Sequence, residues 1–89
     1  MVNYKILYSK EAQKDAKKLT AAGLSDKAKE LIALVALNPF QIPPSYEKLV
    51  GNLSGAYSRR INIKHRLVYQ VDEESKNVRI LRMWSHYGE

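Results

Sequence analysis

The chain contains no cysteine, only two histidines and no long apolar run. The absence of cysteine excludes disulfides and thiolate metal sites, and two histidines without thiolates argue against a structural zinc site. The longest apolar run, residues 31–37, is far too short to cross a bilayer. Residues 1–5 lack the apolar segment of a signal peptide. We therefore expect a cytoplasmic protein that needs neither a metal nor another cofactor.

The 89 residues also contain no internal repeat, no low-complexity segment and no linker. A chain of this length forms one small domain with a modest core. Hydrophobic residues make up 45% of the chain and charged residues 27%, which is ordinary for a folded protein and argues against disorder. We expect a single domain spanning residues 1–89.

Positive charge is in excess, with a net charge of +6, and it is concentrated in the middle of the chain. Glu47 is the only acidic residue of the segment 41–70, whose basic residues are Lys48, Arg59, Arg60, Lys64 and Arg66. A basic surface attracts polyanions such as nucleic acids. Since a solvated basic face also keeps a protein in solution, charge alone leaves nucleic-acid binding at even odds.

The first half of the chain predicts a strand followed by two helices. Residues 2–8 alternate as a strand does, and Ser9 is a candidate N-cap for a helix that runs to about Ala21 and ends at Gly23. Ser25 is the candidate cap of a second helix, which Asn38 and Pro39 end. This second helix carries an apolar stripe at helical spacing: Ala28, Leu31, Ile32, Val35 and Ala36.

The second half predicts β structure after a loop at residues 39–44. Residues 46–50 form a short extended segment, followed by a turn at 51–55 and strands at 57–63 and 66–71. A loop at 72–77 leads into a last strand from 78 to about 85. This order predicts an α+β fold in which a helical pair covers one face of a twisted, mainly antiparallel sheet.

Alternation along the two central strands predicts which side chains share the other face of the sheet. Arg60 shares its side with Ser58 and Asn62, while Arg59 lies on the side of Tyr57 and Ile61. On the next strand Arg66 lies with Val68 and Gln70. We expect an open sheet surface bearing arginines, which fits a docked RNA backbone.

Cleavage of RNA requires few protein groups because RNA carries its own nucleophile, the 2′-hydroxyl. The protein has to remove that proton, protonate the leaving 5′-oxygen and neutralise the transition state. Glu47 is a candidate base, His86 a candidate acid, and Arg66 could bind the phosphate through two N–H groups. Each has a simpler interpretation: Glu47 as a solvated carboxylate, His86 as a surface residue, and Arg66 as the ion-pair partner of Glu47 or Glu89.

The remaining aromatic and basic candidates are also open to two interpretations. Tyr87 could stack on a base or simply cover the sheet edge. Arg60 could contact phosphate or pair with an acid, and its claim to catalysis is weaker than that of Arg66. We assign Trp84 to packing and His65 to shaping the turn between the central strands.

Five segments together resemble the YoeB/Txe branch of the RelE-type toxins, the toxic halves of bacterial type II toxin–antitoxin modules. They are Glu47-Lys48-Leu49, Asn52-Leu53-Ser54-Gly55, Ser58-Arg59-Arg60-Ile61, His65-Arg66-Leu67-Val68-Tyr69 and the terminal His86-Tyr87. The first half of the chain agrees mainly in pattern. The resemblance implies a RelE-like fold and a ribosome-dependent endoribonuclease that cleaves mRNA in the A site without a metal.

The resemblance also implies a role for each residue and a set of partners. Glu47 would be the general base, Arg66 would stabilise the transition state, and His86 would be the general acid. Substrate would be held by Tyr87 and Arg60, and we add Arg59 and Lys48 to this expected set. The partners would be the ribosome with its mRNA and a cognate antitoxin that folds on binding, with operator DNA bound only through the antitoxin complex.

Three features depart from the family's pattern. Val50 stands where the family has a phosphate-facing lysine, Tyr57 stands in place of a tryptophan, and Gly88 and Glu89 extend the chain beyond Tyr87. Two other functions stay open beside the leading one. A non-catalytic inhibitor of DNA gyrase on the same scaffold would not need Glu47, Arg66 and His86, and a basic RNA-binding module would bind free RNA in a salt-dependent way.

Overall fold

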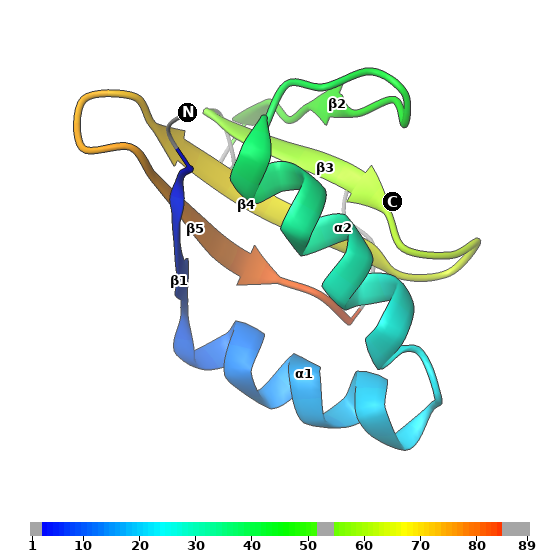
Figure 1. Cartoon of the computed structure of the whole chain (residues 1–89). Coiled ribbons are helices and arrows are strands. Elements are labelled where there is room, and N and C mark those ends of the chain that lie inside the picture. The colour runs from blue at the N-terminus through cyan, green and yellow to red at the C-terminus, as the bar shows by residue number, and fades with distance from the viewer. Residues whose placement is uncertain (1–2, 52–54, 85–89) are drawn as a thin grey trace.

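The computed structural model describes residues 3–51 and 55–84 and has an α+β fold, as the sequence predicts. The element order is β1 (Lys5–Tyr8), α1 (Lys10–Ala21), α2 (Ser25–Leu37), β2 (Glu47–Lys48), β3 (Ala56–Arg60), β4 (Arg66–Asp72) and β5 (Asn77–Arg82) (Figure 1). His86 and Tyr87 lie outside the described residues, as do Val2, Ser85 and the centre of the predicted turn at 51–55.

The five strands form one sheet in the order β1-β5-β4-β3-β2. All neighbouring strands are antiparallel except β1, which pairs in parallel with β5. The predicted mainly antiparallel sheet is therefore confirmed. The first strand of the chain, β1, lies at one edge of the sheet beside the last strand, β5.

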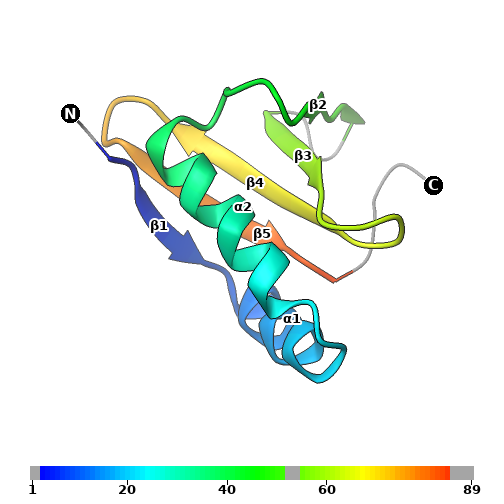
Figure 2. The same cartoon turned by 45° about the vertical axis from the view of Figure 1, so that its right-hand side comes forward.

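Both helices pack on the same face of this sheet (Figures 1 and 2). Every second residue of the central strands enters the core, where the side chains of Leu67, Tyr69, Val78 and Ile80 meet Ala12, Leu19, Ala28 and Val35 of the helices. Of the predicted stripe on α2, Ala28 and Val35 are buried, and Leu31, Ile32 and Ala36 are half-buried. We call the opposite side of the sheet the helix-free face.

The predicted start is correct for α1 and wrong by one residue for α2. Ser9 caps α1, since its side chain accepts a hydrogen bond from the backbone N–H of Ala12. The N-cap of α2 is Leu24 rather than Ser25, and its side chain makes no capping hydrogen bond. The reason lies in a tight turn through Gly23 (φ 74°), where the Leu24 N–H donates back to the Leu19 carbonyl at 2.8 Å.

The predicted strand at 57–63 is too long at its end, because β3 stops at Arg60. The Asn62 side chain accepts hydrogen bonds from the backbone N–H groups of Lys64 and His65, at 2.9 and 2.7 Å, which turns the chain. The His65 ring stacks on Trp84 with 4.1 Å between centroids, and Trp84 is half-buried against the core. The packing role predicted for Trp84 is confirmed.

None of the helices in the described part of the chain is long and apolar enough to cross a membrane.

Candidate functional site

The ends of β2, β3 and β4 form a hollow of about 360 Å³ on the helix-free face. Its lining residues are Pro44, Ser45, Tyr46, Glu47, Ser58, Arg60 and Arg66. Strand pairing explains why they meet, because Glu47 lies opposite Ser58, and Arg60 lies opposite Arg66. A hollow of this size is within the range of small-ligand sites.

Two arginines lie directly opposite each other across β3 and β4 in this hollow. Like charges in such cross-strand pairs destabilise a sheet. Glu47 partly offsets the repulsion, since Arg66 Nη1 donates a hydrogen bond to Glu47 Oε1. An anion between Arg60 and Arg66 would offset it further, so the pair favours a site that binds phosphate.

The ion pair between Glu47 and Arg66 is open to solvent, with 66% of the Glu47 side chain and 22% of the Arg66 side chain exposed. Exposed ion pairs contribute little to stability. A guanidinium has five N–H donors, so Arg66 can bind Glu47 through one and a phosphate through others. The arrangement therefore places a carboxylate next to a group that can hold a phosphate.

The sequence predicts that Arg60 and Arg66 share the more polar side of their strands. Both line this hollow, so that prediction is confirmed.

Arg59 does not reach this hollow, because its side chain is fully buried on the other side of β3. Its guanidinium donates to the carbonyls of Pro44 and Pro39 at 2.6 and 2.9 Å and to the Tyr69 hydroxyl at 2.9 Å. The prediction that Arg59 binds substrate does not fit this burial, and we leave it out of the proposed substrate-binding set. Arg59 lies on the same side of its strand as Tyr57 and Ile61, and this alternation in the sequence already indicates a position facing the core.

Lys48 also stays away from the hollow around Glu47. Its side chain is exposed, it lies opposite Tyr57 in the strand pairing, and it lines a separate hollow with Val50. The structure brings Glu47, Arg60 and Arg66 together and leaves Lys48 outside that group. His86 and Tyr87, the other predicted site residues, lie outside the described part of the chain.

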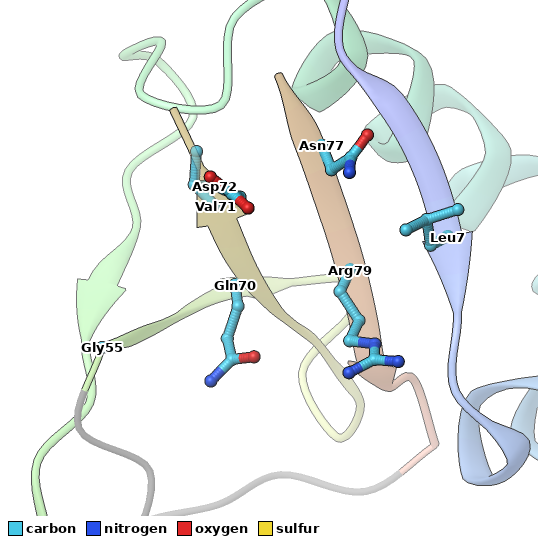
Figure 3. Close-up of a pocket in the computed structure, with 7 residues that line it drawn as sticks. All are labelled: Leu7, Gly55, Gln70, Val71, Asp72, Asn77 and Arg79. Carbon is cyan, nitrogen blue, oxygen red and sulfur yellow. The ribbon is translucent and has the colours of Figure 1, made fainter. Parts of the chain in front are cut away.

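A second hollow of about 300 Å³ lies further along the sheet, over β4, β5 and β1. Gln70 and Arg79 are directly opposite in the strand pairing, and their side chains extend to the same side of the sheet (Figure 3). Gln70 shares the alternation of Arg66 on β4, so this hollow also opens on the helix-free face. The sequence alone does not indicate that Arg79 lines a hollow, because its neighbours in the sheet depend on how β5 pairs with β4.

The fold is shared with small bacterial toxins of known structure. A YoeB/ParE toxin from Agrobacterium tumefaciens superposes with a TM-score of 0.84 and 27% identity, covering 93% of this chain and 99% of that one. A YoeB–YefM complex from Staphylococcus aureus contains a chain that superposes with a TM-score of 0.79 and 35% identity. That match covers 97% of this chain and 100% of the other.

Residues 8–87 match the model of the YoeB-like toxin of bacterial type II toxin–antitoxin systems, and the chain belongs to this family. Toxin YoeB of Synechocystis sp. is 42% identical over 57 residues, a match that covers 64% of each chain. The aligned part is thus less than two-thirds of the length of that curated relative. The expected resemblance to the YoeB branch is confirmed.

Proposed function

We propose that the protein is a ribosome-dependent endoribonuclease toxin that cleaves mRNA in the ribosomal A site and thereby inhibits translation. The observation that carries this proposal is the contact between Glu47 and Arg66 beside Arg60 on the helix-free face. It supplies a base and two phosphate-binding groups within one hollow.

The reaction needs two proton transfers and one displacement at phosphorus. Glu47 removes the proton of the 2′-hydroxyl, and the 2′-oxygen attacks the adjacent phosphorus. His86 protonates the departing 5′-oxygen, which leaves a 2′,3′-cyclic phosphate and a 5′-hydroxyl end. Each proton transfer contributes on the order of 10²–10⁴ to the rate. Because side chains supply both transfers, the proposed reaction requires no metal.

Arg66 and Arg60 neutralise the charge that develops on the phosphate oxygens. Both arginines point into the hollow with Glu47, and a guanidinium matches the geometry of two phosphate oxygens. We assign Tyr87 to holding a base. Lys48 is exposed on the side of β2 opposite to Glu47, so it would contact RNA away from the scissile phosphate.

The proposed partners are a cognate antitoxin and the ribosome with its mRNA. The Staphylococcus aureus relative was solved as a YoeB–YefM complex, which supports an antitoxin partner of that kind. Operator DNA would be bound only through the toxin–antitoxin complex. The basic helix-free face, with Arg60, Arg66 and Arg79 along it, supports an RNA substrate.

Growth arrest by variants with intact folds tests the assigned roles. Glu47→Gln keeps the shape of the side chain and removes the base, so it should abolish growth arrest on induced expression. Arg66→Ala and His86→Ala should do the same, while circular dichroism of the purified proteins stays unchanged. A folded Glu47→Gln variant with full toxicity would contradict the catalytic role and favour a non-catalytic inhibitor.

A further inference from the structure

The loop at residues 39–46 joins α2 to β2 (Figure 1). It is attached to one buried side chain, that of Arg59. Arg59 Nη1 donates to the Pro44 carbonyl at 2.6 Å, and Nη2 donates to the Pro39 carbonyl at 2.9 Å. The guanidinium carbon also lies 4.9 Å from the centroid of the Tyr46 ring. Arg59 therefore contacts the beginning, the middle and the end of this loop.

Tyr69 on β4 also holds this loop, through hydrogen bonds with Arg59 and with the Pro39 carbonyl. Arg59 Nε donates to the Tyr69 hydroxyl at 2.9 Å, and that hydroxyl donates to the Pro39 carbonyl at 2.7 Å. Burial raises the pKa of Tyr69, and this outweighs the opposite effect of Arg59, so the hydroxyl stays protonated and able to donate. Both side chains are fully buried, which fixes their positions by packing.

A charged side chain at this position is costly for the fold. Within residues 3–51 and 55–84, no carboxylate lies within salt-bridge distance of Arg59. A buried charge is tolerated only when it is well hydrogen-bonded, and an apolar side chain of similar volume is often at least as stable. The Arg59 guanidinium instead holds two carbonyls of the loop at defined positions, which an apolar side chain could not do.

Of the three charged residues in the hollow, Glu47 is the one nearest to this loop in the chain. It directly follows Tyr46, and β2 consists only of Glu47 and Lys48, paired with two residues of β3. So short a pairing fixes the direction of a side chain weakly. The Tyr46 ring packs edge-on against the Tyr57 ring, with 5.6 Å between centroids, and against the Arg59 guanidinium. The position of Tyr46 therefore determines where the backbone of Glu47 lies.

We propose that Arg59 is a positioning residue, which holds the loop at 39–46 so that the Glu47 carboxylate lies beside Arg66 and the scissile phosphate. The inference rests on the proposed function, in which Glu47 is the general base. A displacement of about 1 Å in a reacting group lowers a rate on the order of a hundredfold. Loosening the loop should therefore slow the chemical step with little change in substrate affinity.

Single-turnover cleavage of mRNA on stalled ribosomes, with the toxin in excess, separates positioning from general stability. Arg59→Lys keeps the charge but cannot reach three acceptors at once, and Tyr69→Phe removes only the hydroxyl. Each should lower the maximal rate about tenfold and leave the half-saturating toxin concentration unchanged. If one variant fails to fold, the other decides the question.

The decisive comparison repeats these substitutions in the Glu47→Gln background over time courses of hours. Residues that act through one group have non-additive effects, so Arg59→Lys should change the residual rate by less than about twofold there. Ser9→Ala removes hydrogen bonds to Ala12 and Leu81 and none to this loop, so it lowers stability without loosening the loop. It is the control, and it should cleave at the wild-type rate below the unfolding temperature of the variant.

Two results would overturn the positioning role: a tenfold loss from Arg59→Lys in both backgrounds, or no loss in the wild-type background. Failure of the proposed function gives a different pattern, since the wild-type protein would then leave the mRNA intact. A rate that depends on Glu47 but is insensitive to both Arg59→Lys and Tyr69→Phe would contradict only the positioning role.

Discussion

Arg59 and Arg60 are neighbours in the chain and have opposite surroundings, because successive side chains of a strand point to opposite faces. Arg60 is exposed beside Arg66, whereas Arg59 is buried among loop carbonyls. Alternation in the sequence predicts the two sides correctly. It could not reveal the acceptors of Arg59, because the carbonyls of Pro39 and Pro44 reach it only through the path of the loop.

Asp15 is a second buried charged residue, and its partners come from the other end of the chain. It accepts hydrogen bonds from Arg82 Nε at 2.8 Å and from the backbone N–H of Met83 at 2.9 Å. Asp15→Asn weakens both bonds and should lower the free energy of unfolding by about 2 kcal/mol, the middle of the range for hydrogen bonds to charged groups. Urea unfolding at neutral pH measures this difference, and a change below about 0.5 kcal/mol would contradict it.

The contribution of Asp15 should also depend on pH. Burial acts to raise the pKa of Asp15, but the hydrogen bonds from Arg82 and the Met83 N–H outweigh it, so the pKa is lowered in the folded state. A carboxyl whose folded pKa is depressed stabilises the fold above its unfolded pKa of about 3.9 and loses this contribution as the pH falls further. The difference in the free energy of unfolding between the wild-type protein and Asp15→Asn should be constant between about pH 6 and 7, well above the unfolded pKa, and should shrink below about pH 4. A difference that grows on acidification would contradict this sign.

At the scale of elements, the start of α1 is fixed by one side chain with two contacts. Ser9 Oγ accepts from the Ala12 N–H at 3.0 Å and donates to the Leu81 carbonyl of β5 at 2.8 Å. Ser9→Ala should lower the free energy of unfolding by about 1–2 kcal/mol, which combines the loss of the cap with an unpaired carbonyl. Ser25→Ala is the matched control and should cost less than about 0.5 kcal/mol, since Ser25 does not cap α2. Equal losses in the two variants would contradict this difference.

Most elements could be predicted because their signals are local. The apolar stripe of α2 and the alternation of β4 each lie within a single segment of sequence, and both predictions are correct in type. The end of β3 was predicted too late because the side chain of Asn62 turns the chain within an otherwise alternating pattern. The parallel pairing of β1 with β5 depends on the whole path between them, which no local pattern contains.

At the scale of the whole molecule, the sheet separates two kinds of surface. One face is covered by α1 and α2 and contains the core (Figure 1). The other face carries the hollow around Glu47 and the hollow around Arg79, of which the second is drawn in Figure 3. The sequence predicts this separation through alternation. From the sequence, Glu47 and Glu89 are both candidate ion-pair partners of Arg66, and the structure pairs it with Glu47. Periodicity does not predict this contact, because it depends on the pairing of β2 with β3 and of β3 with β4.

The central claim is cleavage of mRNA in the ribosomal A site with Glu47 as the base. The most direct measurement adds the purified protein to ribosomes stalled at a defined codon and maps the mRNA 5′ ends by primer extension. The account predicts a new end within the A-site codon that forms with the wild-type protein and, in the same reaction time, does not form with Glu47→Gln or with His86→Ala. An intact message across a range of A-site codons, with folded wild-type protein and accessible A sites, would contradict it.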